Sequence, residues 1–158
     1  MTFFTLELLI RLITSFVASV AFAIVFKTNK RHLLSVGIAG FITYFVFYTS
    51  LYLNTSLFLA AFASTFVATL YGEISARISH APAIIFLVAG LIPIVPGGDS
   101  YYTMKYFIEG NTALALEKLG ATGLVALGIA SGIVAVSVIV GIYFDTLHKI
   151  KNKRKKES

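Results

Sequence analysis

The sequence contains no cysteine among its 158 residues, which excludes a disulfide framework, a thiolate metal site and a cysteine nucleophile. Charge is also scarce, because Asp, Glu, Lys and Arg together account for 13% of the residues, about half of their usual share in a soluble domain. Hydrophobic residues make up 58% of the chain. This composition excludes a soluble globular fold and indicates a protein that folds in a lipid bilayer.

Long apolar runs replace the missing charge, and most of them are long enough to cross the roughly 30 Å hydrocarbon layer as a helix. The runs are continuously apolar, whereas strands of a membrane barrel would alternate. We therefore expect an all-α integral membrane protein with about five transmembrane helices, over residues 6–26, 33–53, 57–78, 83–95 and 120–144. Tight turns are expected at 27–32 and 79–82. Residues 96–119 are too polar for a lipid-facing helix throughout, and suit either a re-entrant segment or a surface helix.

The cations are distributed unevenly between the ends of these spans. With the N-terminus outside, ten face the cytoplasm (Lys27, Lys30, Arg31, Arg77, Lys149, Lys151, Lys153, Arg154, Lys155 and Lys156) and three face outward (Arg11, Lys105 and Lys118). Because Lys and Arg accumulate in cytoplasmic loops, this predicts an N-out, C-in topology. We expect a single transmembrane domain over 1–148 and a basic cytoplasmic tail over 149–158 that lies near anionic lipid headgroups, rather than a nucleic-acid-binding segment.

The third expected span carries two neighbouring rows of residues with a spacing of four. The first row consists of small residues, which lets helix backbones approach closely in lipid: Ala60, Ser64, Ala68, Gly72 and Ala76. The second row is polar and should face protein or water: Ala61, Thr65, Thr69, Glu73 and Arg77. Glu73 is either half of an ion pair with Arg77 near the cytoplasmic interface, or a carboxylate that binds a proton or a substrate cation.

Two further polar features lie closer to the expected outer surface. Glu7 and Arg11 have the same spacing as Glu73 and Arg77, and here an interfacial ion pair is the simpler interpretation. Tyr52 lies near the outer end of the second span, where it suits an interfacial aromatic belt. Tyr44 lies deeper in the same span. A buried phenol requires a hydrogen-bond partner, so Tyr44 could line a polar pathway.

The fourth span is expected to break at its end, because two prolines remove backbone donors and a glycine pair permits unusual dihedrals. Asp99 or Ser100 could cap a new helix over 101–108, whose first amide groups would attract an anion. The alternative is an ordinary turn followed by an amphipathic interfacial helix. In the last span, Gly128 and Gly132 form a helix-packing motif. We expect the substrate-binding residues to be Pro93, Pro96, Gly97, Gly98, Ser100, Tyr101 and Tyr102, with Glu73 as proton-coupling candidate and Thr65, Thr69 and Arg77 as its polar support.

The residues around this break resemble a known family. Pro93, Pro96, Gly97 and Tyr101 match the Pro-x-x-Pro-Gly-x-x-x-Tyr pattern of the small subunit of split threonine/serine exporters, and an Ala-Phe-Ala-Ile-Val-Phe run at 21–26 precedes a basic turn as in that family. The resemblance implies a secondary exporter of threonine, serine or succinate in a bacterial inner membrane. It also implies coupling to the proton gradient and a larger membrane subunit as partner, which agrees with the odd number of spans.

Other classes of function find less support in the residues. His32, His80 and His148 are scattered, and neither a phosphate-binding loop nor a nucleophile with its base is present, so we expect no enzyme, no metal and no cofactor. The rival interpretations are a scaffold subunit that holds partner helices through its small residues, and a homo-oligomeric channel lined by tyrosines.

Overall fold

The computed structural model describes the backbone of residues 2–156 and the side chains of residues 6–143. The described chain is helical throughout its regular structure. Its elements are α1 (Thr2–Val25), η1 (Lys30–His32), α2 (Leu33–Tyr52), α3 (Leu57–Ser79), α4 (Ala83–Leu91), η2 (Ile92–Ile94), α5 (Gly97–Ile108) and α6 (Thr112–Lys156). The last two residues of the expected basic tail, 157 and 158, lie outside the described residues.

The predicted fold class is confirmed. Within the described residues, four helices are long and apolar enough to cross a membrane, and the segments Ala83–Ile94 and Gly97–Ile108 form a further candidate span that is bent by 51°. The predicted boundaries of the first three spans agree with α1, α2 and α3 to within a few residues. The last helix begins at Thr112 instead of residue 120. Glu117 and Lys118, which we expected to precede this helix, lie inside it.

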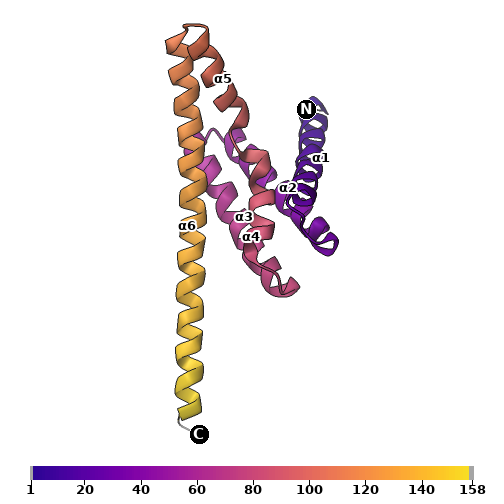
Figure 1. The fold of residues 1–158 in the computed structure, drawn as a ribbon, viewed down its shortest axis with the longest axis vertical. Coiled ribbons are helices and arrows are strands. Elements are labelled where there is room, and N and C mark those ends of the chain that lie inside the picture. The colour runs from indigo at the N-terminus through magenta and orange to yellow at the C-terminus, as the bar shows by residue number, and fades with distance from the viewer. Residues whose placement is uncertain (1, 157–158) are drawn as a thin grey trace.

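The helices are arranged around a central group of three, as Figure 1 shows. Helix α2 contacts α1, α3 and α4, and α3 also contacts α4 and α6, so α1 and α6 lie on opposite sides of this group. Helix α5 packs against the beginning of α6, and the two form a hairpin at one end of the molecule. The C-terminal part of α6 extends past the opposite end of the bundle.

The interior is built from small residues, and the surface carries the large apolar ones. Phe86 is the largest fully buried side chain of the described chain, whereas most of the other buried hydrophobic positions are alanines. Large side chains such as Ile13, Ile74 and Val134 are exposed on the helix surfaces. This distribution is typical of a membrane bundle, in which close packing of helices stabilises the fold while lipid solvates the outside.

Both rows of α3 contact neighbouring helices: the small-residue row packs against α4, as predicted for close helix packing, and the polar row packs against α6. A methyl group placed on Gly72 would meet Phe86 of α4 at 3.6 Å. On the other side, methyl groups on Gly128 and Gly132 of α6 would lie 2.7 Å from the Cβ of Ala61 and 2.9 Å from that of Thr65. The predicted packing motif of the last span is therefore an α3–α6 contact in which the backbones nearly touch.

Candidate functional site

The fourth span breaks where the prolines predict. Helix α4 ends at Leu91, a short 3₁₀ turn contains Pro93, and α5 begins after Pro96. The predicted side-chain cap is wrong: Pro96 occupies the N-cap position, so Asp99 and Ser100 lie within the first turn of α5. The Ser100 hydroxyl instead donates a hydrogen bond to the Pro96 carbonyl, at 2.8 Å.

The glycine pair after Pro96 has a different role from the one expected. Neither Gly97 nor Gly98 has a positive φ, so the turn does not use their conformational freedom. A methyl group on either would meet no atom within 4 Å. Because glycine has no side chain, the first amide groups of α5 are accessible to an approaching ligand or helix. Asp99 lies in the same turn, where its carboxylate pairs with the Lys118 ammonium at 3.0 Å.

The two tyrosines of the expected site lie on α5. Their rings pack edge to face at 5.5 Å, and the ring of Tyr102 also stacks on Tyr106 at 6.0 Å. Tyr101 lines a groove of about 230 Å³ with Met104, Lys105, Ile108 and Glu109. This groove and the cleft described next have no lining residue in common.

A cleft of about 270 Å³ opens beside the break, where α1, α2 and η2 meet. It is lined by Arg11, Thr14, Ser15, Ala18, Tyr44 and Pro93. Clefts that hold drug-sized ligands measure roughly 300–1,000 Å³, so this one suits a smaller molecule. Of the seven residues that we expected to bind substrate, Pro93 is the one that lines this cleft.

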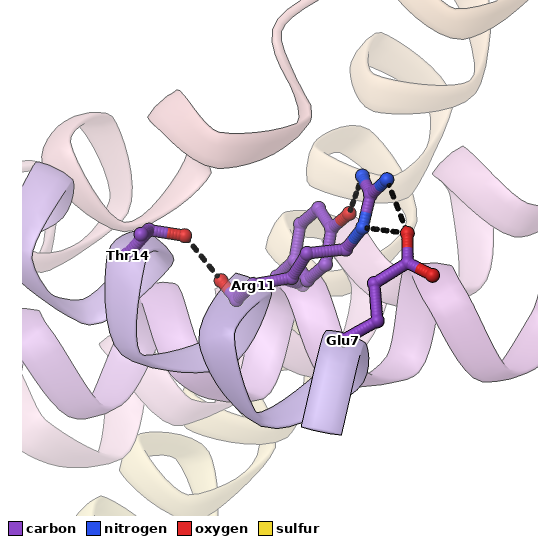
Figure 2. A network of polar contacts seen from close by, with 4 residues as sticks. Glu7, Arg11 and Thr14 are labelled. Carbon is purple, nitrogen blue, oxygen red and sulfur yellow. Dashed lines mark hydrogen bonds and ion pairs between the residues drawn. The ribbon is translucent and has the colours of Figure 1, made fainter. Parts of the chain in front are cut away.

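Arg11, which lines this cleft, is the centre of the network of polar contacts in Figure 2. Its Nε and Nη2 atoms donate to the same carboxylate oxygen of Glu7, at 3.1 and 2.7 Å. Its Nη1 atom donates to the hydroxyl of Tyr44 at 3.2 Å, which is the partner that a half-buried phenol requires. The hydroxyls of Thr14 and Ser15 donate to the carbonyl of Arg11 at 2.9 and 2.7 Å. Helix α1 thus presents a cation and two hydroxyls to the cleft, from Arg11, Thr14 and Ser15, while the Glu7 carboxylate pairs with this cation from the preceding turn.

The surroundings of this charge pair are apolar. Glu7 and Arg11 lie within the candidate span Leu6–Val25, and their side chains are 53% and 50% exposed. Leu9 and Ile13 of the same helix are exposed beside them. Ionised groups at membrane depth are costly, and they tend to mark pathways for substrates or ions.

The second charge pair, on α3, also forms. The Arg77 guanidinium lies 2.8 Å from the Glu73 carboxylate, with the two side chains 41% and 24% exposed. The distance fits an ordinary ion pair one helical turn apart. The role of Glu73 in proton coupling stays a prediction.

Glu73 and the break lie at different levels of the bundle. Its neighbour Gly72 faces Ala83 and Phe86 at the beginning of α4. Pro93 follows Ala83 by ten residues, which corresponds to about 15 Å along a helix. The structure therefore places Arg11 and Tyr44, rather than Glu73, beside the break.

The threonines of the polar row face protein, as predicted. Thr65 and Thr69 are buried, and the Thr69 hydroxyl donates to the Thr65 carbonyl at 2.7 Å. The Thr65 hydroxyl has no hydrogen-bond partner in the described chain, and the Cβ and Cγ2 atoms of Thr65 lie against Gly132 of α6. The row thus begins in the α3–α6 contact and ends at the partly exposed pair Glu73–Arg77.

Sequence reasoning missed the Arg11 site because its members come from different helices. The spacing of Glu7 and Arg11 predicted an ion pair, and the depth of Tyr44 predicted a polar partner. The hydrogen bond between Arg11 and Tyr44, which lie 33 positions apart in the sequence, joins these two features. Without that contact, the simplest reading of Arg11 was an interfacial cation.

These features together define a multi-pass helical membrane protein with a broken span and a charged cleft inside its apolar region, an arrangement typical of transporters. The family comparison makes the class specific. The family model described as "Threonine/Serine exporter, ThrE" matches residues 11–139, most of the chain, and the chain belongs to this family. The resemblance noted from the sequence is thereby confirmed. No curated protein and no solved structure gives a significant match.

Proposed function

We propose that this chain is the small membrane subunit of a secondary exporter of threonine, serine or a similar small carboxylate such as succinate, and that a larger membrane subunit completes the transporter. The observation that carries the proposal is the broken fourth span beside the charged cleft, in a chain of the threonine/serine exporter family. A span count of up to five supports the need for a partner, because many transporters combine two halves of opposite topology.

The proposed mechanism has two parts. The amide groups and hydroxyls between Pro96 and Tyr102 hold the substrate carboxylate next to the break, where Gly97 and Gly98 leave the backbone accessible. Glu73 takes up and releases the proton that couples export to the gradient, while Arg77 stabilises its ionised form. Thr65 and Thr69 support this pair from the same face of α3.

The proposed orientation is N-out and C-in, in a bacterial inner membrane. The turns before α2 and before α4, together with the C-terminus, then face the cytoplasm, and the hairpin of α5 and α6 faces outward. The basic residues at 27–31 and in the 149–158 tail support this choice, since they lie at the proposed cytoplasmic ends.

Uptake into inverted membrane vesicles tests the proposal. Radiolabelled threonine, serine and succinate are supplied in turn, with the chain expressed alone and together with a candidate larger subunit. We expect gradient-dependent uptake only from the pair. Uptake by the chain alone would instead identify a homo-oligomeric channel or transporter, and its absence from both preparations would favour the scaffold role or another substrate.

A further inference from the structure

We propose that an α-amino acid binds as a zwitterion at the cleft between α1, α2 and η2, with its carboxylate on Arg11, which lines the cleft, and its ammonium group on Glu7, which pairs with Arg11 beside the cleft. This inference rests on the proposed function, since it names the site at which the exported amino acid is recognised. Arg11 binds the substrate carboxylate at a different stage of export from the amide groups between Pro96 and Tyr102, and Glu7 adds a binding element for the amino group, which those amide groups do not supply.

Arg11 retains the capacity to bind a carboxylate. A guanidinium has five N–H groups in a planar fork. Three of them are used in the described structure, two on Glu7 and one on Tyr44, so two N–H groups stay available, one each on Nη1 and Nη2. Two N–H groups on one guanidinium match the two oxygens of a carboxylate, and such bidentate contacts are among the stronger hydrogen bonds in proteins.

Glu7 retains the matching capacity for a cation. Both contacts from Arg11 go to one carboxylate oxygen, Oε1. The other oxygen, Oε2, makes no hydrogen bond to the described residues. An ammonium group has three donors and no acceptor, so it requires an oxygen of this kind. The two charged side chains therefore present opposite charges one helical turn apart, as a zwitterion requires.

The location of the pair argues for an occupant. Glu7 and Arg11 are the second and sixth residues of the candidate span Leu6–Val25, and both side chains are about half exposed. Facing lipid, that exposed half of each charged group would be poorly solvated, at a cost that membrane proteins generally avoid. Glu7 and Arg11 neutralise each other, so a bound zwitterion keeps the site neutral and adds hydrogen bonds to the Arg11 N–H groups and the Glu7 Oε2 atom that have no partner among the described residues.

The remaining lining suits a small hydroxylated side chain. The hydroxyls of Thr14 and Ser15 each spend their single donor on the carbonyl of Arg11, which leaves their oxygen atoms as acceptors. A substrate hydroxyl can donate to either of them. Ala18 and Pro93 provide an apolar wall, and the volume of about 270 Å³ excludes large side chains. This lining favours serine and threonine over larger amino acids.

The test separates recognition of the ammonium group from recognition of the carboxylate. The probe is tritiated L-serine, bound to the purified full chain in the assembly that exports in vesicles. The competitor is glycerate, which has a hydroxyl in place of the amino group of serine. Glu7→Gln removes the charge but keeps the shape, and Arg11→Lys keeps the charge but removes the fork. Glu109→Gln is the matched control, because Glu109 pairs with Lys105 at the same spacing and with similar exposure.

We expect Glu7→Gln to weaken serine binding by about tenfold or more, the effect of losing one hydrogen bond to a charged group, while competition by glycerate stays unchanged. Arg11→Lys should weaken serine and glycerate together. Glu109→Gln should bind both as the unchanged chain does.

Two results would overturn the inference while leaving the proposed function intact. One is export by the assembly with serine binding unaffected by Glu7→Gln. The other is equal loss of serine and glycerate in that variant, which would reduce Glu7 to a structural partner of Arg11. If the assembly that carries no substitution neither binds nor exports serine, both proposals are overturned.

Discussion

The α3–α6 contact allows a quantitative prediction about the stability of the bundle. Replacing Gly128 by alanine adds a methyl group 2.7 Å from the carbonyl oxygen of Phe58 and 2.7 Å from the Cβ of Ala61. The first of these is a backbone atom, so the strain cannot be relieved by rotating a side chain. The two helices must separate instead, and overpacking of this kind costs about 1–3 kcal/mol.

Gly141 provides the control on the same helix, since a methyl group there meets no atom within 4 Å. Alanine at either position gains the same helix propensity, up to about 1 kcal/mol over glycine. The difference between Gly128→Ala and Gly141→Ala therefore isolates the packing cost. We expect it to equal about 1–3 kcal/mol, or roughly a 5- to 150-fold change in the folding equilibrium constant.

The measurement is unfolding of the purified full chain in mixed micelles of increasing SDS content, followed by circular dichroism, with the same starting detergent for both variants. Equal midpoints for the two variants would refute the reasoning, because they would mean that α3 and α6 do not pack as closely as the structure shows.

Three further predictions concern topology, coupling and the outer hairpin. Because the chain has no cysteine, single cysteines report orientation: Leu53→Cys should react with a membrane-impermeant maleimide in intact cells and Lys30→Cys only in inverted vesicles, and the opposite pattern would reverse the topology. Glu73→Gln should abolish gradient-driven export while the protein still inserts, and unchanged export would remove Glu73 from the mechanism. Gly110 has a φ of +76°, a backbone conformation that costs an L-residue such as alanine about 1–2 kcal/mol, so Gly110→Ala should lower the free energy of unfolding by that amount. Gly120 lies within α6 with open space around it, so Gly120→Ala should not lower it. Equal effects of the two substitutions in the same SDS titration would contradict this prediction.

The sequence predicted the parts of the fold that depend on local composition. The apolar runs located the spans, and the prolines at 93 and 96 located the break, because each acts on its own stretch of chain. The start of α5 was less predictable, since Asp99 and Ser100 are good caps in isolation but Pro96 takes that position. The helix therefore begins three to four residues earlier than those side chains indicate.

The candidate site was less accessible to prediction than the fold. Glu73 was a candidate from the sequence because it lies in a regular row on one helix. Arg11 becomes a candidate only because Tyr44 and Pro93, on other elements, line the same cleft. No periodicity within one span encodes that arrangement. Contacts between helices decide which of several charged residues lies beside the break.

The glycine contacts between helices also limit how the protein can move. Gly40 of α2 meets Ser19 of α1, Gly90 of α4 meets Ala39 of α2, and Gly128 of α6 meets Ala61 of α3, all with almost no clearance. Helices that touch at backbone level have little freedom to slide past each other, since dense packing resists continuous deformation. In the proposed exporter, a transport cycle would then rock this bundle as one rigid block against the larger subunit that we propose, with the cleft at Arg11 alternately uncovered and closed by that motion.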